Sequence, residues 1–445
     1  MVPVVEGVGA AGLRPEAAAS KEGLFARAEA AIGGPRSGAE AAFFVPGRIE
    51  VLGKHTDYAG GRSLLCAAEQ GFCMVARPRP DRRVTIRNVD SGERADLALD
   101  PDLEPQVGHW SNYPATVLRR VARNFPDAAS GADLAFGSDL PPASGMSSSS
   151  AFMIAVFLAI AAVNRLDDRA AYRSAIRSRT DLAGYLGTVE NGQTFGCLAG
   201  DKGVGTFGGS EDHTAILCCR PATLSQYRFS PVHFERDVPM PAGCGFVVAF
   251  SGLLAEKTGA ALATYNRASH AAARVLEIWR AASGRAVSTL EAAVNEGPGT
   301  ADDIRRAISA SSDAASDATV LLKRFDQFVL ESGTILPSAG DALRDGDLRR
   351  FGDLVERSQR AAEEWLGNQV PETAWLARQA RTLGAAAASA FGAGFGGSVW
   401  ALVETARAGD FMREWRGAYA RAYPDASARA VFFETSPGPS AFRLA

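Results

Sequence analysis

The chain has 445 residues, of which 47% are hydrophobic and 22% are charged, and its formal net charge is -3. These values are ordinary for a folded globular protein and exclude a disordered or fibrous chain. The small negative charge excludes a general positive field that would hold nucleic acid or an anionic membrane surface. At this length we expect two domains, at residues 1–235 and 236–445.

Nothing in the sequence predicts a membrane or secretory segment. The longest strongly apolar run, residues 151–163, is too short for a helix that crosses a bilayer of about 30 Å. The first residues lack a basic region followed by an apolar stretch and a cleavage site. We therefore expect a cytoplasmic protein without a membrane partner, and we expect it to be a monomer or a weak dimer.

Strand and helix patterns alternate irregularly along the chain. Residues 43–89 hold β-branched, apolar segments separated by Gly and Pro turns, which predicts a sheet. Helical periodicity is predicted over residues 110–122, from residue 151 onward, and over residues 165–186, 257–281, 382–390 and 411–419. Further strands are predicted over residues 133–136, 212–219, 245–250, 398–403 and 428–434. Because these elements do not follow a steady βαβ repeat, the pattern favours the α+β class.

A loop at residues 141–151, PPASGMSSSSA, places a glycine and four consecutive serines directly before an apolar helix. A helix N-terminus presents unpaired N–H groups and the positive end of the helix dipole, and glycine lets phosphate approach the backbone. Serine hydroxyls can also cap the helix or bind Mg²⁺. The segment predicts either a phosphate-binding loop or an ordinary serine N-cap, and the pattern alone does not choose between them.

A second glycine loop, FGAGFGG at residues 391–397, satisfies the pattern GxGxxG. A dinucleotide-binding loop follows a strand and opens a helix, whereas this loop leads into a predicted strand, so a dinucleotide enzyme is disfavoured. A P-loop is also absent, because the Gly-Lys pair that precedes His55 is not followed by Ser or Thr.

Three segments, taken together, resemble the motifs of one enzyme family. Residues 46–61, PGRIEVLGKHTDYAGG, resemble the signature PGRVNLIGEHTDYNGG of the galactokinase branch of the GHMP kinases. The serine loop resembles the second family motif, PxxxGLSSSA, and residues 392–398, GAGFGGS, resemble the third, GGGFGGC. Segments around Trp110 and Tyr265 resemble the family's WxNY and SEYNxRR segments, so the similarity runs from about residue 42 to the C-terminus.

This resemblance implies a fold, an activity and a catalytic pair. The implied fold has a ribosomal-protein-S5-like N-terminal domain and a ferredoxin-like C-terminal domain, and the implied activity is ATP-dependent phosphorylation of the anomeric hydroxyl of galactose or a related hexose. Asp212 falls where the family has the aspartate of CGIMDQ, and Arg48 matches the arginine beside it. A carboxylate next to a guanidinium stays ionised and can accept the hydroxyl proton, while Arg48 adds charge near the transferred phosphoryl group. Without the resemblance, Asp212 would be interpreted as a solvated turn residue.

ATP and Mg²⁺ are the implied phosphoryl donor and cofactor. Glu190 matches the family's metal-binding glutamate, and Ser148 is its predicted hydroxyl partner. The predicted nucleotide contacts come from the two loops and from an aromatic residue that also fits a core position; they are Trp110, Gly145, Ser147, Ser148, Ser149, Gly394 and Gly396.

The predicted sugar contacts are Lys54, His55, Asp57, Gly209 and Tyr265. Lys54 stands where the family motif GEHTDY has a glutamate that reaches C6 of the sugar, so a donor-only cation replaces an acceptor-only anion. The chain has only five lysines against 42 arginines. One interpretation is a substrate with an acid at C6, such as galacturonate. In the others, Lys54 donates to an ordinary C6 hydroxyl, or turns toward Glu50 and is structural.

A further departure is the segment between Glu190 and Asp212, which is about ten residues longer than in the family and lies beside the predicted sugar site. Two other functions stay open. The chain could be a GHMP kinase for another small hydroxy compound, or a non-catalytic sensor that binds sugar and ATP. The presence of Arg48, Asp212 and Glu190 favours catalysis, because a sensor needs neither a base nor a metal ligand.

Overall fold

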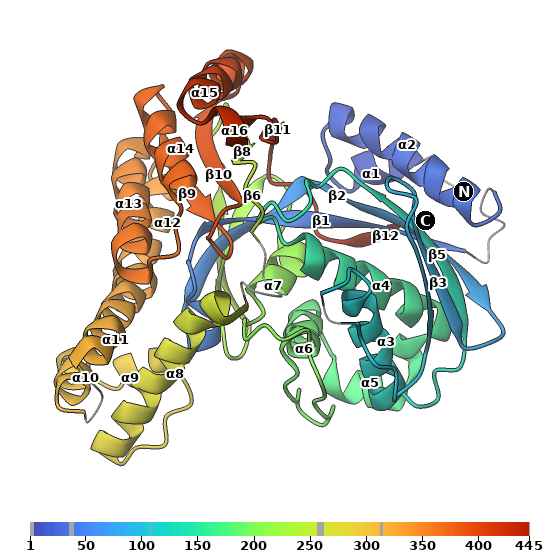
Figure 1. Cartoon of the computed structure of the whole chain (residues 1–445), viewed down its shortest axis with the longest axis horizontal. Coiled ribbons are helices and arrows are strands. Elements are labelled where there is room, and N and C mark those ends of the chain that lie inside the picture. Colours follow the sequence, from blue (N-terminus) through green and yellow to red (C-terminus); the bar gives the residue numbers. More distant parts are fainter. Residues whose placement is uncertain (1–3, 35–39, 107, 256–261, 312–314, 445) are drawn as a thin grey trace.

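The computed structural model describes residues 4–34, 40–106, 108–255, 262–311 and 315–444. Within these residues the chain forms one sheet of eight strands and one of four, each with its own helices (Figure 1). This combination confirms the predicted α+β class. No helix in the described ranges is both long and apolar enough to cross a bilayer.

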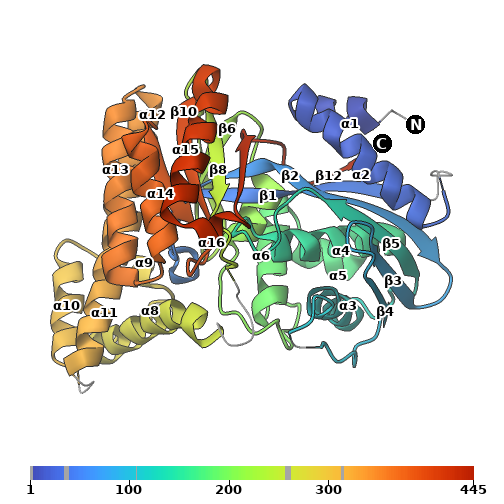
Figure 2. The same ribbon diagram turned by 45° about the horizontal axis from the view of Figure 1, so that its top comes forward.

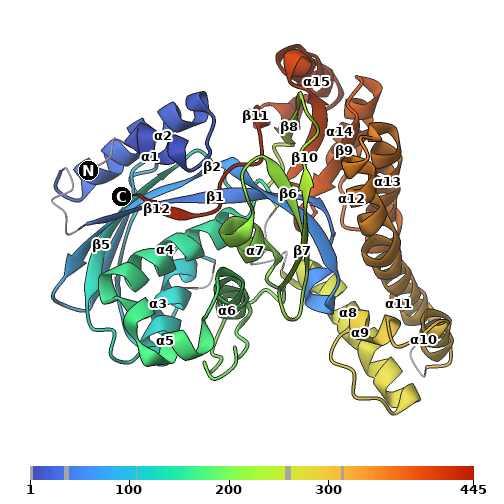
Figure 3. The ribbon, with the colours of Figure 1, turned by 180° about the vertical axis from the view of Figure 1, so that it is seen from behind.

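The larger sheet has the strand order β12-β1-β2-β5-β3-β4, and β6 and β7 extend it from the beginning of β2. The strands are β1 (Ala41–Leu52), β2 (Arg62–Arg79), β3 (Arg83–Asn88), β4 (Arg94–Ala98), β5 (Gly131–Ser138), β6 (Thr223–Arg228), β7 (His233–Pro239) and β12 (Phe442–Leu444). Neighbouring strands are antiparallel except for β3 and β5. Figure 3 shows that β12 brings the C-terminal end of the chain back beside β1.

Helices cover both faces of this sheet (Figures 1 and 3). One face carries α3 (Asn112–Asn124), α4 (Ser148–Asn164), α5 (Ala170–Ala175), α6 (Arg179–Asn191) and α7 (Glu211–Cys218); the other carries α1 (Val4–Ala10) and α2 (Pro15–Ala31). Because successive side chains of a strand point to opposite faces, Phe43 and Val45 join the core on the α4 side, while Phe44 packs in the cluster with Phe25 of α2. Every residue of β1 is therefore buried, and the N-terminal leader is part of the fold.

The smaller sheet has the order β11-β8-β10-β9 with antiparallel neighbours, which is the ferredoxin-like arrangement that the resemblance implied. Its strands are β8 (Cys244–Phe250), β9 (Ala387–Phe391), β10 (Ser398–Glu404) and β11 (Val431–Thr435). Nearby helices are α12 (Leu336–Arg344), α13 (Leu348–Ala361), α14 (Pro371–Thr382), α15 (Ala408–Ala422) and α16 (Pro424–Ser427). A separate helical group, clearest in Figure 2, contains α8 (Leu262–Ser283), α9 (Leu290–Val294), α10 (Thr300–Ser309) and α11 (Ala315–Phe328).

Two predicted elements have the wrong type. Residues 212–219, predicted as a strand, lie mostly in helix α7, and residues 387–390, predicted as helical, belong to strand β9. Both segments are short and almost wholly buried, so they lack the one-sided pattern that separates helix from strand. In β9, pairing with β10 overrides the helical propensity of its alanines.

The predicted domain boundary between residues 235 and 236 falls inside β7, which pairs with β6 in the larger sheet. Strand β12 also belongs to that sheet. We therefore propose a boundary between Pro239 and Cys244, with the last residues of the chain returning to the first domain.

Candidate active site

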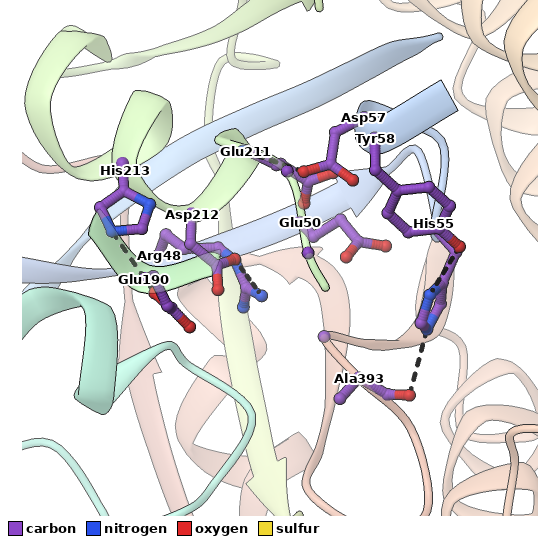
Figure 4. A pocket seen from close by; sticks show the side chains of 13 residues that line it. Arg48, Glu50, His55, Asp57, Tyr58, Glu190, Glu211, Asp212, His213 and Ala393 are labelled. Carbon is purple, nitrogen blue, oxygen red and sulfur yellow. Dashed lines mark hydrogen bonds and ion pairs between the residues drawn. The ribbon is translucent and has the colours of Figure 1, made fainter. Parts of the chain in front are cut away.

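A cavity opens where the end of β1 meets the loop after β9. Its walls come from both sheets and from helices α6 and α7, as Figure 4 shows. The lining residues are Arg48, Glu50, His55, Asp57, Tyr58, Glu190, Gly208, Gly209, Glu211, Asp212, His213, Gly392 and Ala393. Five of these side chains are carboxylates, so the cavity has an acidic lining.

Arg48 and Asp212, the predicted catalytic pair, are in direct contact. The Nη2 and Nε atoms of Arg48 lie 2.7 and 2.8 Å from Oδ1 of Asp212. Arg48 also donates to the carbonyl of Gly145 in the serine loop, and its guanidinium lies 5.9 Å from the ring centre of Phe391. Burial lowers the pKa of Arg48, but the nearby carboxylates of Asp212, Glu50 and Glu211 outweigh this effect and raise it, so Arg48 carries a permanent charge.

Glu50 and Glu211 form a buried acidic pair that the sequence interpretation missed. Glu50 is 4% exposed, and its Oε1 has no hydrogen-bond partner among the described residues. Glu211 is 5% exposed, and its Oε2 accepts a 2.7 Å hydrogen bond from Ser63. Burial raises the pKa of Glu50 to about 7 against the opposing charges of Arg48 and Lys54, and burial together with the charge of Glu50 raises the pKa of Glu211 well above its ordinary value. One signal was present in the sequence, because Glu50 stands where the quoted family signature has Asn.

Three of the predicted sugar contacts line the cavity. Oδ2 of Asp57 accepts a 3.1 Å hydrogen bond from the backbone N–H of Glu211. A Cβ on Gly209 would lie 2.4 Å from the same Oδ2, so only glycine lets this loop pass beside Asp57. His55 donates from Nε2 to the carbonyl of Ala393 over 3.2 Å, which links the signature loop to the glycine loop.

Lys54 does not line the cavity, contrary to its predicted role as a sugar contact. Its side chain is 1% exposed, and its Nζ donates to Ser389 over 2.7 Å and to Ser358 over 3.3 Å. The ammonium group is thus held by two hydroxyls of the C-terminal half, which agrees with a structural role. Tyr265 lies in α8, but its side chain is outside the described part of the structure.

The serine loop ends at α4, as predicted, with Ser147 in a left-handed conformation (φ 59°) at the N-cap and Ser148 and Ser149 in the first turn. It is Ser150, however, that contacts the predicted metal ligand: its Oγ donates to Oε2 of Glu190 over 2.8 Å and lies 3.4 Å from Oδ2 of Asp212. The predicted partner Ser148 has no such contact among the described hydrogen bonds, because the helix turns the 150 position toward α6. Ser150 is therefore a second candidate for the hydroxyl partner, beside the predicted Ser148.

Glu190 offers the hard oxygen that Mg²⁺ prefers, and the serine hydroxyls beside it are of the same chemical type. The described residues contain no preformed group of three or more His, Cys, Asp and Glu side chains that could hold a metal. The donor set therefore fits a weakly coordinated Mg²⁺ whose other ligands come from phosphate and water.

The two predicted nucleotide loops touch each other. A Cβ on Gly392 would lie 2.6 Å from the carbonyl oxygen of Gly145, and both glycines have positive φ. A Cβ on Gly394 would likewise collide with the carbonyl oxygen of Asn368, and one on Gly396 with that of Leu253. Both glycines therefore determine the path of the loop. Trp110 lies 6.0 Å from the ring of Phe152 and packs against the hydrophobic core, and it does not line the cavity.

The raised pKa of Glu50 predicts a defined pH dependence of stability. Between its ordinary pKa of 4.5 and the folded value of about 7, the folded protein keeps a proton that the unfolded chain has lost, so its stability falls as the pH rises. The wild type should lose about 2 kcal/mol of free energy of unfolding from pH 5 to pH 8 through this proton, and Glu50→Gln should not show this loss. Urea unfolding at both pH values measures this. The exposed substitution Glu22→Gln on α2 is the control, and parallel pH curves for wild type and Glu50→Gln would contradict the prediction.

Comparison with family models identifies three regions of the chain. The galactokinase galactose-binding signature matches residues 31–78, the GHMP kinase N-terminal domain matches residues 112–190, and the GHMP kinase C-terminal domain matches residues 341–421. The three models therefore cover the signature loop, the serine loop with Glu190, and the glycine loop.

Similar proteins agree with these models. The galactokinase of Roseiflexus sp. (strain RS-1) is 29% identical over 389 residues, which cover 86% of this chain and 88% of that protein. The galactokinase of Chloroflexus aggregans is 27% identical over 84% of this chain and 87% of its own length. The crystal structure of Lactococcus lactis galactokinase complexed with galactose superposes with a TM-score of 0.74 at 23% identity, covering 93% of this chain and 97% of that one. The chain therefore carries the galactokinase signature and both GHMP kinase domains, and these matches indicate a sugar kinase of the galactokinase type.

Proposed function

We propose that this kinase transfers the γ-phosphoryl group of ATP to the anomeric hydroxyl of galactose or a closely related hexose that carries no acid group. The observation that carries the proposal is the 2.7 Å contact between Arg48 and Asp212, in a cavity lined by the glycine loop, with Arg48 also bonded to Gly145 of the serine loop. A kinase needs a positioned carboxylate and an anion-binding loop at one place, and these elements supply both.

The proposed chemistry uses Asp212 as the acceptor of the sugar's hydroxyl proton. As that oxygen forms its bond to the γ-phosphorus, the bond from phosphorus to the bridging oxygen of ADP breaks, and the proton passes to Asp212. Arg48 keeps Asp212 ionised and oriented before the step, and its charge offsets the negative charge on the phosphoryl oxygens during it. The backbone N–H groups at the start of α4, where Ser147 and the following serines lie, would stabilise the remaining negative charge of the phosphates.

Mg²⁺, when bound, neutralises charge on the phosphates. Glu190 and the hydroxyls of Ser148 or Ser150 are the groups of this chain that would hold it. Ser150 also contacts Asp212, so the same hydroxyl connects the proposed metal ligand to the proposed base. The proposed nucleotide contacts also include Gly145, Ser149, Gly394 and Gly396. A nucleotide contact by Trp110 remains a prediction from the sequence, as do a cytoplasmic location and a monomeric or weakly dimeric state.

A sugar without an acid group suits this cavity better than a hexuronic acid. The lining contains five carboxylates, and the one lysine proposed as a partner for a C6 acid is bonded to Ser389 and Ser358 instead. A further carboxylate would have to be buried beside like charges, which is costly. His55, Asp57 and Gly209 are the proposed sugar contacts.

The central experiment measures ADP release with ATP and Mg²⁺ for galactose, glucose, arabinose, galacturonate and glucuronate. We expect galactose to be the best of these five and Asp212→Asn to lower kcat by about 10²–10⁴, because the amide cannot accept the proton. Thermal unfolding of both proteins establishes that the variant is folded. Turnover by folded Asp212→Asn near the wild-type rate would remove the proposed base, and no turnover of any sugar by wild type would favour a sensor.

Lys54 provides a separate test of substrate charge. We expect Lys54→Met to change the ratio of kcat/KM for galactose and galacturonate by less than about threefold, because Nζ is bonded to Ser389 and Ser358 and Lys54 does not line the cavity. A carboxylate contact would instead shift this ratio by about 100-fold or more. Arg306→Met, on the exposed surface of α10, is the control for loss of one positive charge.

A further inference from the structure

Glu50 lines the cavity but has no part in the proposed phosphoryl transfer. It lies two residues after Arg48 on β1, so both side chains point to the same face of the strand, roughly 7 Å apart. Figure 4 shows its carboxylate in the middle of the cavity, between Asp212 on one side and His55 with Ala393 on the other. Its Oε1 is buried and lacks a hydrogen-bond partner among the described residues. A buried acceptor without a partner is costly, and a ligand donor can remove that cost.

The charges around Glu50 are unbalanced in the free protein. Burial raises the pKa of Glu50, the charges of Arg48 and Lys54 and a hydrogen bond with the Glu211 side chain lower it, and the charge of Asp212 raises it. Asp57 accepts from the backbone of Glu211, so the carboxyl groups in this region outnumber the cations. The cation that lines the cavity beside Glu50 is Arg48, which already forms an ion pair with Asp212 and a hydrogen bond to the Gly145 carbonyl. Lys54 is bonded to Ser389 and Ser358 and does not reach into the cavity. The group that would complete this region is therefore a positively charged donor brought by the ligand.

We propose that Glu50 is a specificity residue that recognises an ammonium group on the substrate, so that the preferred sugar is an amino sugar with a galactose-like ring. The inference rests on the proposed sugar kinase activity and names its substrate class more closely. An ammonium placed against Oε1 of Glu50 would form a charge-assisted hydrogen bond and add positive charge where carboxyl groups outnumber cations. The roughly 7 Å between Arg48 and Glu50 is within the span of one hexose, so the same molecule can reach Asp212 with its anomeric hydroxyl.

The test compares galactose with the four amino-deoxygalactoses that carry the amine at C2, C3, C4 or C6, together with the N-acetyl form of each. ADP release gives kcat/KM, and calorimetry without ATP and Mg²⁺ gives the dissociation constant of each sugar. We expect at least one amine to exceed galactose about tenfold in both measurements, and its N-acetyl form to lose this advantage because it is neutral. In Glu50→Gln the ratio of that amino sugar to galactose should fall to about one.

The controls separate this inference from the proposed function. Glu331→Gln changes another buried carboxylate that does not line the cavity, and it should leave the amine preference intact. Turnover of galactose without preference for any amine, or a preference that survives in Glu50→Gln, would overturn the inference and leave the kinase proposal standing. If no sugar is phosphorylated, the kinase proposal fails. The ratio of the calorimetric dissociation constants for galactose and the amino sugar then still decides whether Glu50 binds an ammonium group.

Discussion

Arg48 is the side chain on which the arrangement of this site depends. It extends from β1 of the larger sheet, is 2% exposed, and binds Asp212 of α7 and the backbone of Gly145 in the serine loop. It also faces the ring of Phe391 at the end of β9, in the smaller sheet. One buried guanidinium thus joins both sheets, the proposed base and the anion-binding loop. Breaking such a pair would leave Asp212 with an uncompensated charge, which commonly costs several kcal/mol.

A steric constraint works together with this ion pair. The serine loop and the glycine loop approach so closely that a Cβ on Gly392 would collide with the carbonyl of Gly145. Ser398 reinforces the contact with a 2.7 Å hydrogen bond to the carbonyl of Ser144. The serine loop and the glycine loop are therefore fixed against each other. The hydrogen bond from His55 to the carbonyl of Ala393 also links the signature loop to the glycine loop.

Much of the fold could be predicted from the sequence because its motifs are long and keep their order. The α+β class and the start of α4 after the serine loop agree with the structure, and so does the contact between Arg48 and Asp212. The types of α7 and β9 could not be predicted, since buried segments of this length lack a one-sided pattern. The N-terminal leader could not be placed either, because several of its packing partners, such as Ala135 and Leu444, are distant in the sequence.

At the site, the direction of individual side chains could not be predicted from the sequence. Lys54 has a charge that suits an acidic sugar, but its side chain turns to Ser389, and nothing in the local sequence specifies that direction. Ser150 replaces Ser148 beside Glu190 for a similar reason, since four identical serines differ only in their angle around α4. Glu50 and Glu211 come together from segments 161 residues apart, so the acidic pair emerges only in the folded chain.

The most direct test of the central role of Arg48 is sugar-dependent ADP release by Arg48→Lys, measured beside its thermal unfolding. Lysine keeps the positive charge but lacks the planar fork that can hold Asp212 and the Gly145 carbonyl together. We expect a folded variant whose kcat falls by about 100-fold or more. A folded variant with kcat within about threefold of wild type would contradict the claim that this bidentate, bridging contact organises the site.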